Sequence, residues 1–198
     1  METSFLKHLL GIPPERPPWE GLIVHLADTP SCSYRYLRRL LRRLKPDWII
    51  HTGDLADDVK VELYPQLKNL YAQKIVRLLA IVEEQPARVV LVMGNHDVAG
   101  QVRERATFST VLTEPANLKI GKYQFRVGHS QAEIMKAPQA INLFGHDLTV
   151  RSGLREGKLY LNGLEGIHLI CPDTGLFRRL RYPIGTDDSR LVKRRYRP

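Results

Sequence analysis

The alternation of strand and helix patterns in the first half of the chain predicts an α/β fold with a parallel sheet. Two strand–helix units and a third strand follow one another, and such units place parallel strands side by side with helices over the sheet. Beyond residue 117, short apolar segments alternate with turn residues such as Asn162-Gly163, which favours hairpins and a second, more antiparallel sheet. A chain of 198 residues is long enough for one such domain with small appendages.

Three apolar segments of the first half are predicted to be the parallel strands. They are residues 22–26, 47–51 and 88–93, and polar turn residues follow each of them. The connecting helices are expected over about 33–44 and 64–84. In the first helix four leucines recur at i, i+3, i+4 and i+7, whereas five arginines lie outside that face, so the leucine face is expected to be buried.

The second half of the chain contains four further short strand patterns. These are residues 123–127, 141–144, 158–162 and 167–170. Three histidines, His25, His51 and His168, lie within predicted strands. We expect them to be hydrogen-bonded residues of the core rather than ligands.

The two ends of the chain differ in composition from the segment between them. Residues 11–20 contain four prolines, which exclude a helix and suggest an extended arm. Residues 178–198 are basic and only weakly periodic, which is typical of a loosely attached tail. We therefore divide the chain into a proline-rich arm (1–20), a domain (21–177) and a basic tail (178–198).

The composition is that of an ordinary globular protein, with 43% hydrophobic and 26% charged residues. No stretch approaches the roughly 18 apolar residues of a membrane span, and the first residues do not match a signal peptide. Two cysteines provide no disulfide framework, so we expect a cytoplasmic protein without a membrane partner. The formal charge of +9 favours anionic partners: phosphorylated small molecules, nucleic acid or an acidic protein.

Polar residues follow five of the predicted strands at the point where each strand ends. Asp28, Asp54 and the Asn95-His96 pair follow the first three strands, and two later strands end in Gly-His pairs that contain His129 and His146. In an open α/β sheet, ligands bind outside the carboxyl ends of the strands. Hard oxygen donors mixed with imidazole suit Mn, Fe, Zn or a similar divalent ion. The pattern therefore predicts a metal site at one edge of the sheet.

In this order the segments resemble the five signature blocks of calcineurin-like metallophosphoesterases. The resemblance covers residues 22–148, and the Gly-Asn-His-Asp block at 94–97 is its most specific part. It implies a four-layer αββα sandwich of two mixed β-sheets flanked by helices, so that 21–177 would be a metallophosphoesterase domain. It also implies a two-metal site at one edge that hydrolyses phosphomonoesters, phosphodiesters or nucleotide anhydrides.

The resemblance also implies a role for each residue at the strand ends. Asp54 would bridge two metals, and Asp28 would belong to the first of them. Asn95, His129 and His146 would complete the shell of the second metal. His96 would be a catalytic residue that binds no metal, steadies the phosphate together with Asn95 and protonates the leaving alkoxide. The expected cofactor is a divalent ion, Mn²⁺ before Fe, Zn, Ni or Mg.

Two departures from the family pattern fall on ligands of the same metal. The first block normally reads Asp-x-His and the last Gly-His-x-His, but here Pro30 and Leu148 stand in the histidine positions. Neither side chain has a donor atom. We expect one intact metal site and a first site that is weak, empty or rebuilt from a bound water or a nearby side chain. The side chains considered for this role are Asp57, Asp147 and Cys32.

The sequence thus predicts a metal-dependent phosphatase or phosphodiesterase that acts on a phosphorylated small molecule or nucleotide. Retention of His96 favours this enzyme, which would use metal-activated water. Loss of the first metal's histidines favours an alternative, a catalytically weak or inactive scaffold or binding protein of the same fold. A nucleic-acid-binding phosphodiesterase is a third hypothesis, and it is motivated by the charge of +9 alone. No motif specifies the substrate or the oligomeric state.

Overall fold

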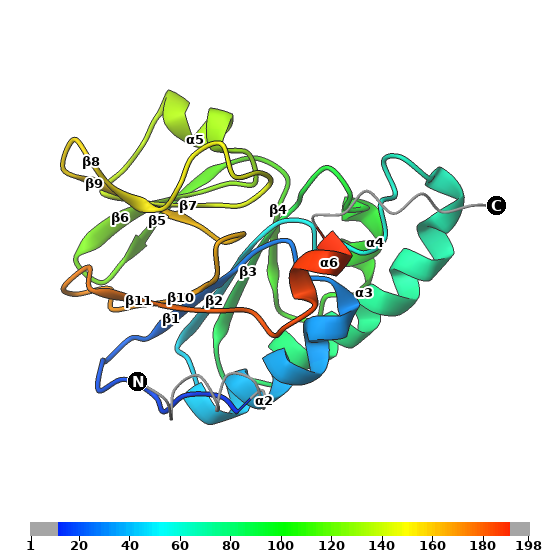
Figure 1. The fold of residues 1–198 in the computed structure, drawn as a ribbon, viewed down its shortest axis with the longest axis horizontal. Helices are drawn as coiled ribbons and strands as arrows, with labels where there is room; N and C mark the ends of the chain where they lie inside the picture. Colours follow the sequence, from blue (N-terminus) through cyan, green and yellow to red (C-terminus); the bar gives the residue numbers. More distant parts are fainter. Residues whose placement is uncertain (1–11, 191–198) are drawn as a thin grey trace.

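A computed structural model of the protein describes residues 12–190, which form two mixed β-sheets that lie face to face (Figure 1). Helices α2 (Tyr34–Leu44) and α3 (Lys68–Val82) cover the outer side of the six-stranded sheet, and α5 (Gln131–Lys136) contacts β7 (Ile141–Phe144) of the five-stranded sheet. The arrangement confirms the predicted two mixed sheets flanked by helices. No helix within residues 12–190 is both long and apolar enough to cross a bilayer.

The six-stranded sheet contains the parallel strands predicted from the first half of the chain. Its order is β11-β10-β1-β2-β3-β4, in which β1 to β4 pair in parallel and β10 pairs antiparallel with both β1 and β11. The bounds are β1 (Ile23–Leu26), β2 (Trp48–Thr52), β3 (Arg88–Val92), β4 (Thr110–Leu112), β10 (Ile167–Ile170) and β11 (Phe177–Leu180). One expectation was wrong: 167–170 is a strand, but it extends the first sheet beside β1 instead of joining the second.

The five-stranded sheet has the order β5-β6-β7-β9-β8 and is less antiparallel than the turn signals predicted. Hairpins join β5 to β6 and β8 to β9, whereas β7 is parallel to both of its neighbours. The remaining bounds are β5 (Ala116–Ile120), β6 (Tyr123–Val127), β8 (Gly153–Arg155) and β9 (Lys158–Asn162). The predicted segments 123–127, 141–144 and 158–162 are confirmed as strands.

The helices follow the predicted amphipathic faces and begin with short 3₁₀ turns. Turn η1 (Ser31–Ser33) precedes α2, and turn η2 (Pro65–Leu67) precedes α3. The four leucines of α2 are fully buried, because their spacing puts them on the face toward the sheet. Two further helices are short, α4 (Ala99–Arg105) and α6 (Thr186–Arg190).

Alternation along the strands separates two apolar cores. In β1, Val24 and Leu26 face the helices, while Ile23 faces the second sheet and packs in one cluster with Phe125 and Leu143. The three histidines expected in the core are fully buried, and two of them, His25 and His168, lie 3.2 Å apart between their Nδ1 atoms. This packing fixes the positions of the strand ends at which the predicted site lies.

The C-terminal segment 178–190 belongs to the folded domain, so the prediction of a loose tail was wrong for these residues. Strand β11 pairs with β10, and Tyr182 is buried and donates a hydrogen bond to the carbonyl of Ala27. The sequence signal was weak because three of the four residues of β11 are exposed. Residues 191–198 lie outside the described part of the chain.

The proline-rich arm forms neither helix nor strand over 12–20, as the prolines predicted. Arg16 attaches it to the domain by hydrogen bonds to the carbonyl of Leu44 (2.8 Å) and to the carboxylate of Asp47 (2.9 Å). Residues 1–11 of the predicted arm lie outside the described residues.

Candidate metal centre

The structure brings the predicted ligands from separate strands to one edge of the sheets. The closest are Asn95 after β3, His129 after β6 and His146 after β7, which we call the ligand triad. Asn95 Oδ1 lies 3.0 Å from His129 Nε2 and 3.1 Å from His146 Nδ1, and these two nitrogens are 3.1 Å apart. Three donor atoms from three loops therefore converge on one point.

The chemistry of the ligand triad fits a cation. His129 Nδ1 lies 2.8 Å from the carbonyl of Thr52 and donates to it, so Nε2 of the neutral ring carries a lone pair. Asn95 Oδ1 is also an acceptor, so two acceptor atoms, His129 Nε2 and Asn95 Oδ1, face each other at 3.0 Å without a proton between them. A cation bound by both atoms would stabilise this arrangement. Ligands about 2.1 Å from an ion and at right angles to each other are roughly 3.0 Å apart, which is the spacing observed here.

Asp54 connects the ligand triad to a group of carboxylates. Donor atoms of Asp28, Asp54 and His129 lie within 4.8 Å of one another, and so do those of Asp54, Asp57 and His96. Asp54 is the residue shared by the two groups, and its Oδ2 is 3.6 Å from His129 Nε2. We call Asp28, Asp54 and Asp57 the carboxylate group. Its three side chains are almost completely buried.

Three of the predicted ligands adopt backbone conformations that L residues rarely adopt. The φ angles of Asp28, Asp54 and His146 are +49°, +53° and +73°. Strain of this kind is found where the surrounding structure holds a functional side chain in place. Here the Asp28 amide donates to the carbonyl of Gly53 (2.9 Å), and the His146 amide donates to Asp28 Oδ2 (3.1 Å).

Glycine is required next to two of the ligands because their loops approach each other closely. A Cβ atom at Gly94 would collide with the carboxylate and the amide of Asp54, and one at Gly145 would collide with the Asp28 carboxylate. The Gly-Asn and Gly-His pairs of the sequence thus reflect close packing of one loop against another.

Asp97, the last residue of the Gly-Asn-His-Asp block, ties the loops after β2 and β3 together. Its carboxylate accepts hydrogen bonds from the amides of Gly94, Asp54 and Leu55 and from the Tyr71 hydroxyl, at 2.8–2.9 Å. No role for Asp97 was predicted from the sequence, although the block that contains it is the most specific part of the resemblance. Asp97 acts on the site by fixing the backbone that carries Asp54.

Burial sets the protonation of the site. It raises the pKa of Asp28 and of Asp54 well above the usual range, and the nearby carboxylates, Asp57 for Asp28 and Asp28 for Asp54, raise both further. Burial likewise raises the pKa of Asp57 to about 6 and lowers the pKa of His129 to about 4. Neutral imidazole is the form that binds metals, and a cation here would favour ionised carboxylates.

Of the three side chains considered for the depleted first metal site, one lies in the cluster. Asp57 is buried and belongs to the carboxylate group. Cys32 is exposed, and its sulfur contacts the hydroxyl of Ser189 at 3.6 Å. The Asp147 side chain accepts a hydrogen bond from the Thr149 amide within its own loop. Pro30 and Leu148 add no donor atom.

Three charged residues at the site were not predicted from the sequence. Lys60 forms an ion pair with Asp57, and Glu62 accepts a hydrogen bond from Asn95 Nδ2. Both lie in the irregular segment after Asp54, where no periodicity or motif marks them. Arg190, in the segment expected to be a loose tail, is buried and points toward the carbonyl of Asp28.

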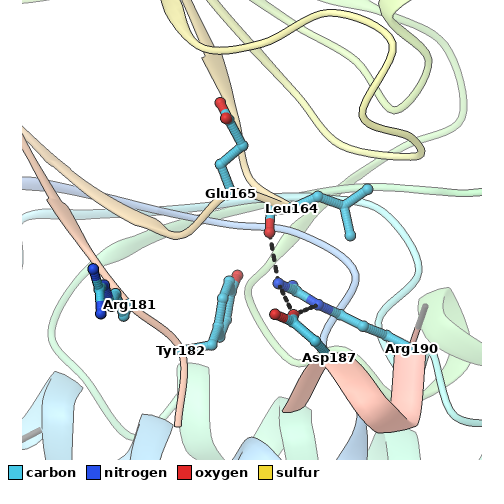
Figure 2. Close-up of a pocket in the computed structure, with 6 residues that line it drawn as sticks. All are labelled: Leu164, Glu165, Arg181, Tyr182, Asp187 and Arg190. Carbon is cyan, nitrogen blue, oxygen red and sulfur yellow. Dashed lines mark hydrogen bonds and ion pairs between the residues drawn. The ribbon is translucent and has the colours of Figure 1, made fainter. Parts of the chain in front are cut away.

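Figure 2 shows how Arg190 is held in a pocket that it lines together with Leu164, Tyr182 and Asp187. Its guanidinium donates to the carbonyl of Leu164 (2.6 Å), pairs with Asp187 (2.7 Å) and lies 4.3 Å from the centre of the Tyr182 ring. Its charge lowers the pKa of both Asp28 and Asp57 against the effect of burial. Arg190 therefore serves as a fixed positive charge near the carboxylate group.

Comparison with known proteins agrees with this geometry. A family model described as calcineurin-like phosphoesterase matches residues 21–194, so the chain belongs to the calcineurin-like phosphoesterase family. The match extends past residue 177, in keeping with the folded C-terminal segment. No curated protein matches the chain.

Solved structures show that the fold is shared with phosphoesterases of very different sequence. The phosphoesterase YfcE from E. coli aligns with a TM-score of 0.58 at 15% identity, over 81% of this chain and 92% of that one. An archaeal phosphodiesterase aligns with a TM-score of 0.53 at 12% identity, over 80% of this chain and 98% of that one. At such identities the likeness concerns the fold alone.

Proposed function

We propose that the protein is a metal-dependent hydrolase of phosphoesters, a phosphomonoesterase or phosphodiesterase. The observation that carries the proposal is the ligand triad, whose three donor atoms lie 3.0–3.1 Å from one another. In such a site a divalent ion lowers the pKa of bound water toward about 7 and offsets charge on the phosphate. Mn²⁺ is our first choice, because mixed amide, imidazole and carboxylate donors suit it.

The chain's own residues would hold the phosphate and supply a proton. His96 belongs to the same group of donor atoms as Asp54 and Asp57, and its backbone amide donates to Asp54 Oδ1 at 3.0 Å. We assign its imidazole to protonation of the leaving alkoxide, and Asn95 and His96 to binding of the phosphate. The resemblance to the family implies these roles, and the position of His96 beside the carboxylate group supports them.

The pKa of His96 bears on its role as a proton donor. A histidine with an ordinary pKa would donate a proton readily near pH 7, but burial and the nearby Lys60 lower the pKa of His96 to about 4 in the protein alone. A phosphate bound beside the ring would act in the opposite direction, because a negative charge favours the imidazolium. Proton donation by His96 is therefore expected to depend on bound substrate.

The substrate we propose is a phosphorylated small molecule or nucleotide, in keeping with the net charge of +9. Support for a nucleic-acid substrate is weaker. It rested on net charge, yet Arg38 and Arg42 of α2 pair with Glu84, and Arg43 pairs with Glu15. The second candidate function is an inactive scaffold of the same fold, which is favoured by the absence of donor atoms at Pro30 and Leu148.

A panel of an aryl phosphate and a bis-aryl phosphodiester with added Mn²⁺ tests the proposal. The wild type should turn over at least one of them, and His96→Ala and Asp54→Asn should abolish the activity. Asp173→Asn is the matched control, since Asp173 is exposed and lies against Gly121 in the turn before β6, whereas His129 follows the other end of that strand. A well-folded wild type without turnover under any of the divalent ions Mn²⁺, Fe²⁺, Zn²⁺, Ni²⁺ and Mg²⁺ would refute the enzyme and favour the scaffold.

A further inference from the structure

The positive charge beside the carboxylate group comes from the chain itself, on the side where the family places the first metal ion. We infer that the Lys60 ammonium takes the place of that ion and binds a phosphate oxygen of the substrate. The protein would then hold a single divalent ion, on the ligand triad. The inference rests on the proposed function and extends it to a specific phosphate-binding residue.

The position of Lys60 is built into the fold. Lys60 Nζ contacts Asp57 Oδ1, and its side chain is only 21% exposed, although lysine is normally a surface residue. Asp57 is itself fixed, since its amide donates to the carbonyl of Thr29 at 3.2 Å. The ammonium is thus anchored to the loops that follow β1 and β2, and these loops carry Asp28 and Asp54.

Lys60 lies beside the group of donor atoms that includes His96. Its ammonium contacts Asp57, and donor atoms of Asp57, Asp54 and His96 lie within 4.8 Å of one another. An ammonium has three donors, and the Asp57 oxygen takes one of them. Lys60 therefore retains donors for an anionic ligand beside His96.

Arg190 has a different task from Lys60. Its guanidinium is engaged by the Leu164 carbonyl and the Asp187 carboxylate, and it is stacked on an aromatic ring (Figure 2). It contributes charge but has little capacity to bind a ligand in this arrangement. Of these two cations, Lys60 is the one that retains hydrogen-bond donors for a ligand.

A balance of charges shows what Lys60 contributes beside one divalent ion. The ionised carboxylate group carries three negative charges, and one divalent ion together with Lys60 balances them, whereas the charge of Arg190 is offset by its partner Asp187. Without Lys60 the same group would keep a net negative charge beside the ion, which opposes binding of a phosphate. Glu62 lies at the rim with more than half of its side chain exposed, so solvent screens its charge.

The number of metal ions is the first test. Metal-stripped protein is incubated with excess Mn²⁺ and desalted, and bound manganese is counted by mass spectrometry. We expect one ion per chain in the wild type and in Lys60→Met. Two tightly held ions in the wild type would overturn the inference, even if the protein hydrolyses phosphoesters.

Binding of inorganic phosphate to the Mn²⁺-loaded protein, measured by calorimetry, is the second test. Loss of one charge-assisted hydrogen bond predicts at least a tenfold weaker affinity in Lys60→Met. Lys122→Met is the control, because Lys122 is exposed on the turn between β5 and β6. Equal affinity in Lys60→Met, Lys122→Met and the wild type would overturn the inference.

A variant is also available in case removal of Lys60 alone prevents folding. Asp57 would be left as a buried carboxylate without its partner, so Lys60→Met is combined with Asp57→Asn, and the same loss of phosphate affinity is expected. Neither test uses turnover. A protein that holds one ion and binds phosphate through Lys60 but hydrolyses nothing would refute the proposed function and leave this inference standing.

Discussion

Acid should destabilise the protein through its buried histidines, and His168 allows this effect to be isolated. Its ring is fully buried on β10, with Nδ1 3.2 Å from His25 Nδ1 and Nε2 without a partner among the described residues. Burial, and after it the positive charge of Arg179, lowers the pKa of His168 to about 3. The unfolded chain, with a pKa near 6.5, binds this proton first, so stability falls as the pH drops below about 6.5.

The size of the effect follows from the two pKa values. For a pKa of about 3 in the folded state and about 6.5 in the unfolded state, lowering the pH from 7 to 5 removes about 2 kcal/mol from the free energy of unfolding. In His168→Leu this contribution disappears. The variant leaves His25 without its partner and is therefore less stable at both pH values, but its loss between pH 7 and pH 5 should be smaller than that of the wild type by about 2 kcal/mol.

The assay is urea unfolding at pH 7 and pH 5, followed by the fluorescence of Trp19 and Trp48 in metal-free protein. Ile170→Leu provides the control, since Ile170 is on the same face of β10 and does not titrate. We expect its pH dependence to match that of the wild type. If His168→Leu loses as much stability as the wild type on acidification, His168 takes up a proton in the folded state and the reasoning is wrong.

Three further outcomes follow from the structure. Asn95→Ala should weaken Mn²⁺ binding by tenfold or more in a titration, because Asn95 belongs to the ligand triad. The control Asn117→Ala, on the exposed edge strand β5, should leave Mn²⁺ binding unchanged. Equal Mn²⁺ affinities of the two variants would exclude the ligand triad as the metal site. Tyr71→Phe removes one of four hydrogen bonds to Asp97 and should lower the free energy of unfolding by about 1–2 kcal/mol; an unchanged urea midpoint would contradict this. Leu40→Ala empties part of the core under α2 and should cost about 2–5 kcal/mol in the same assay, and a cost below 1 kcal/mol would show that the helix repacks.

Local pattern predicted the elements whose burial leaves a clear period in the sequence. The leucine spacing of α2 and the apolar runs of β1, β2 and β3 are repeated signals, because these elements are buried along a whole face or on both faces. Strand β11 and helix α6 left no such signal. The first exposes three of its four residues and the second is a single short turn, so partners distant in sequence determine their structure.

The predicted ligands were also accessible from local sequence, because each directly follows a buried strand and parallel strands end at the same edge of a sheet. The distances between these ligands could not be predicted from local sequence. The spacing of 3.0–3.1 Å within the ligand triad depends on the packing of two sheets against each other, which no single motif contains.

The sequence by itself determined the fold family, the first three strands of the parallel sheet and the residues at the strand ends, since these follow from periodicity and from side chains adjacent in the chain. Only the tertiary structure decided which charges surround those residues. Lys60 follows Asp54 without a motif, and Arg190 lies 162 residues after Asp28 but points toward its carbonyl. The physical reason is that electrostatic interactions depend on distance in space, and chain folding brings together groups whose separation in sequence carries no information about it.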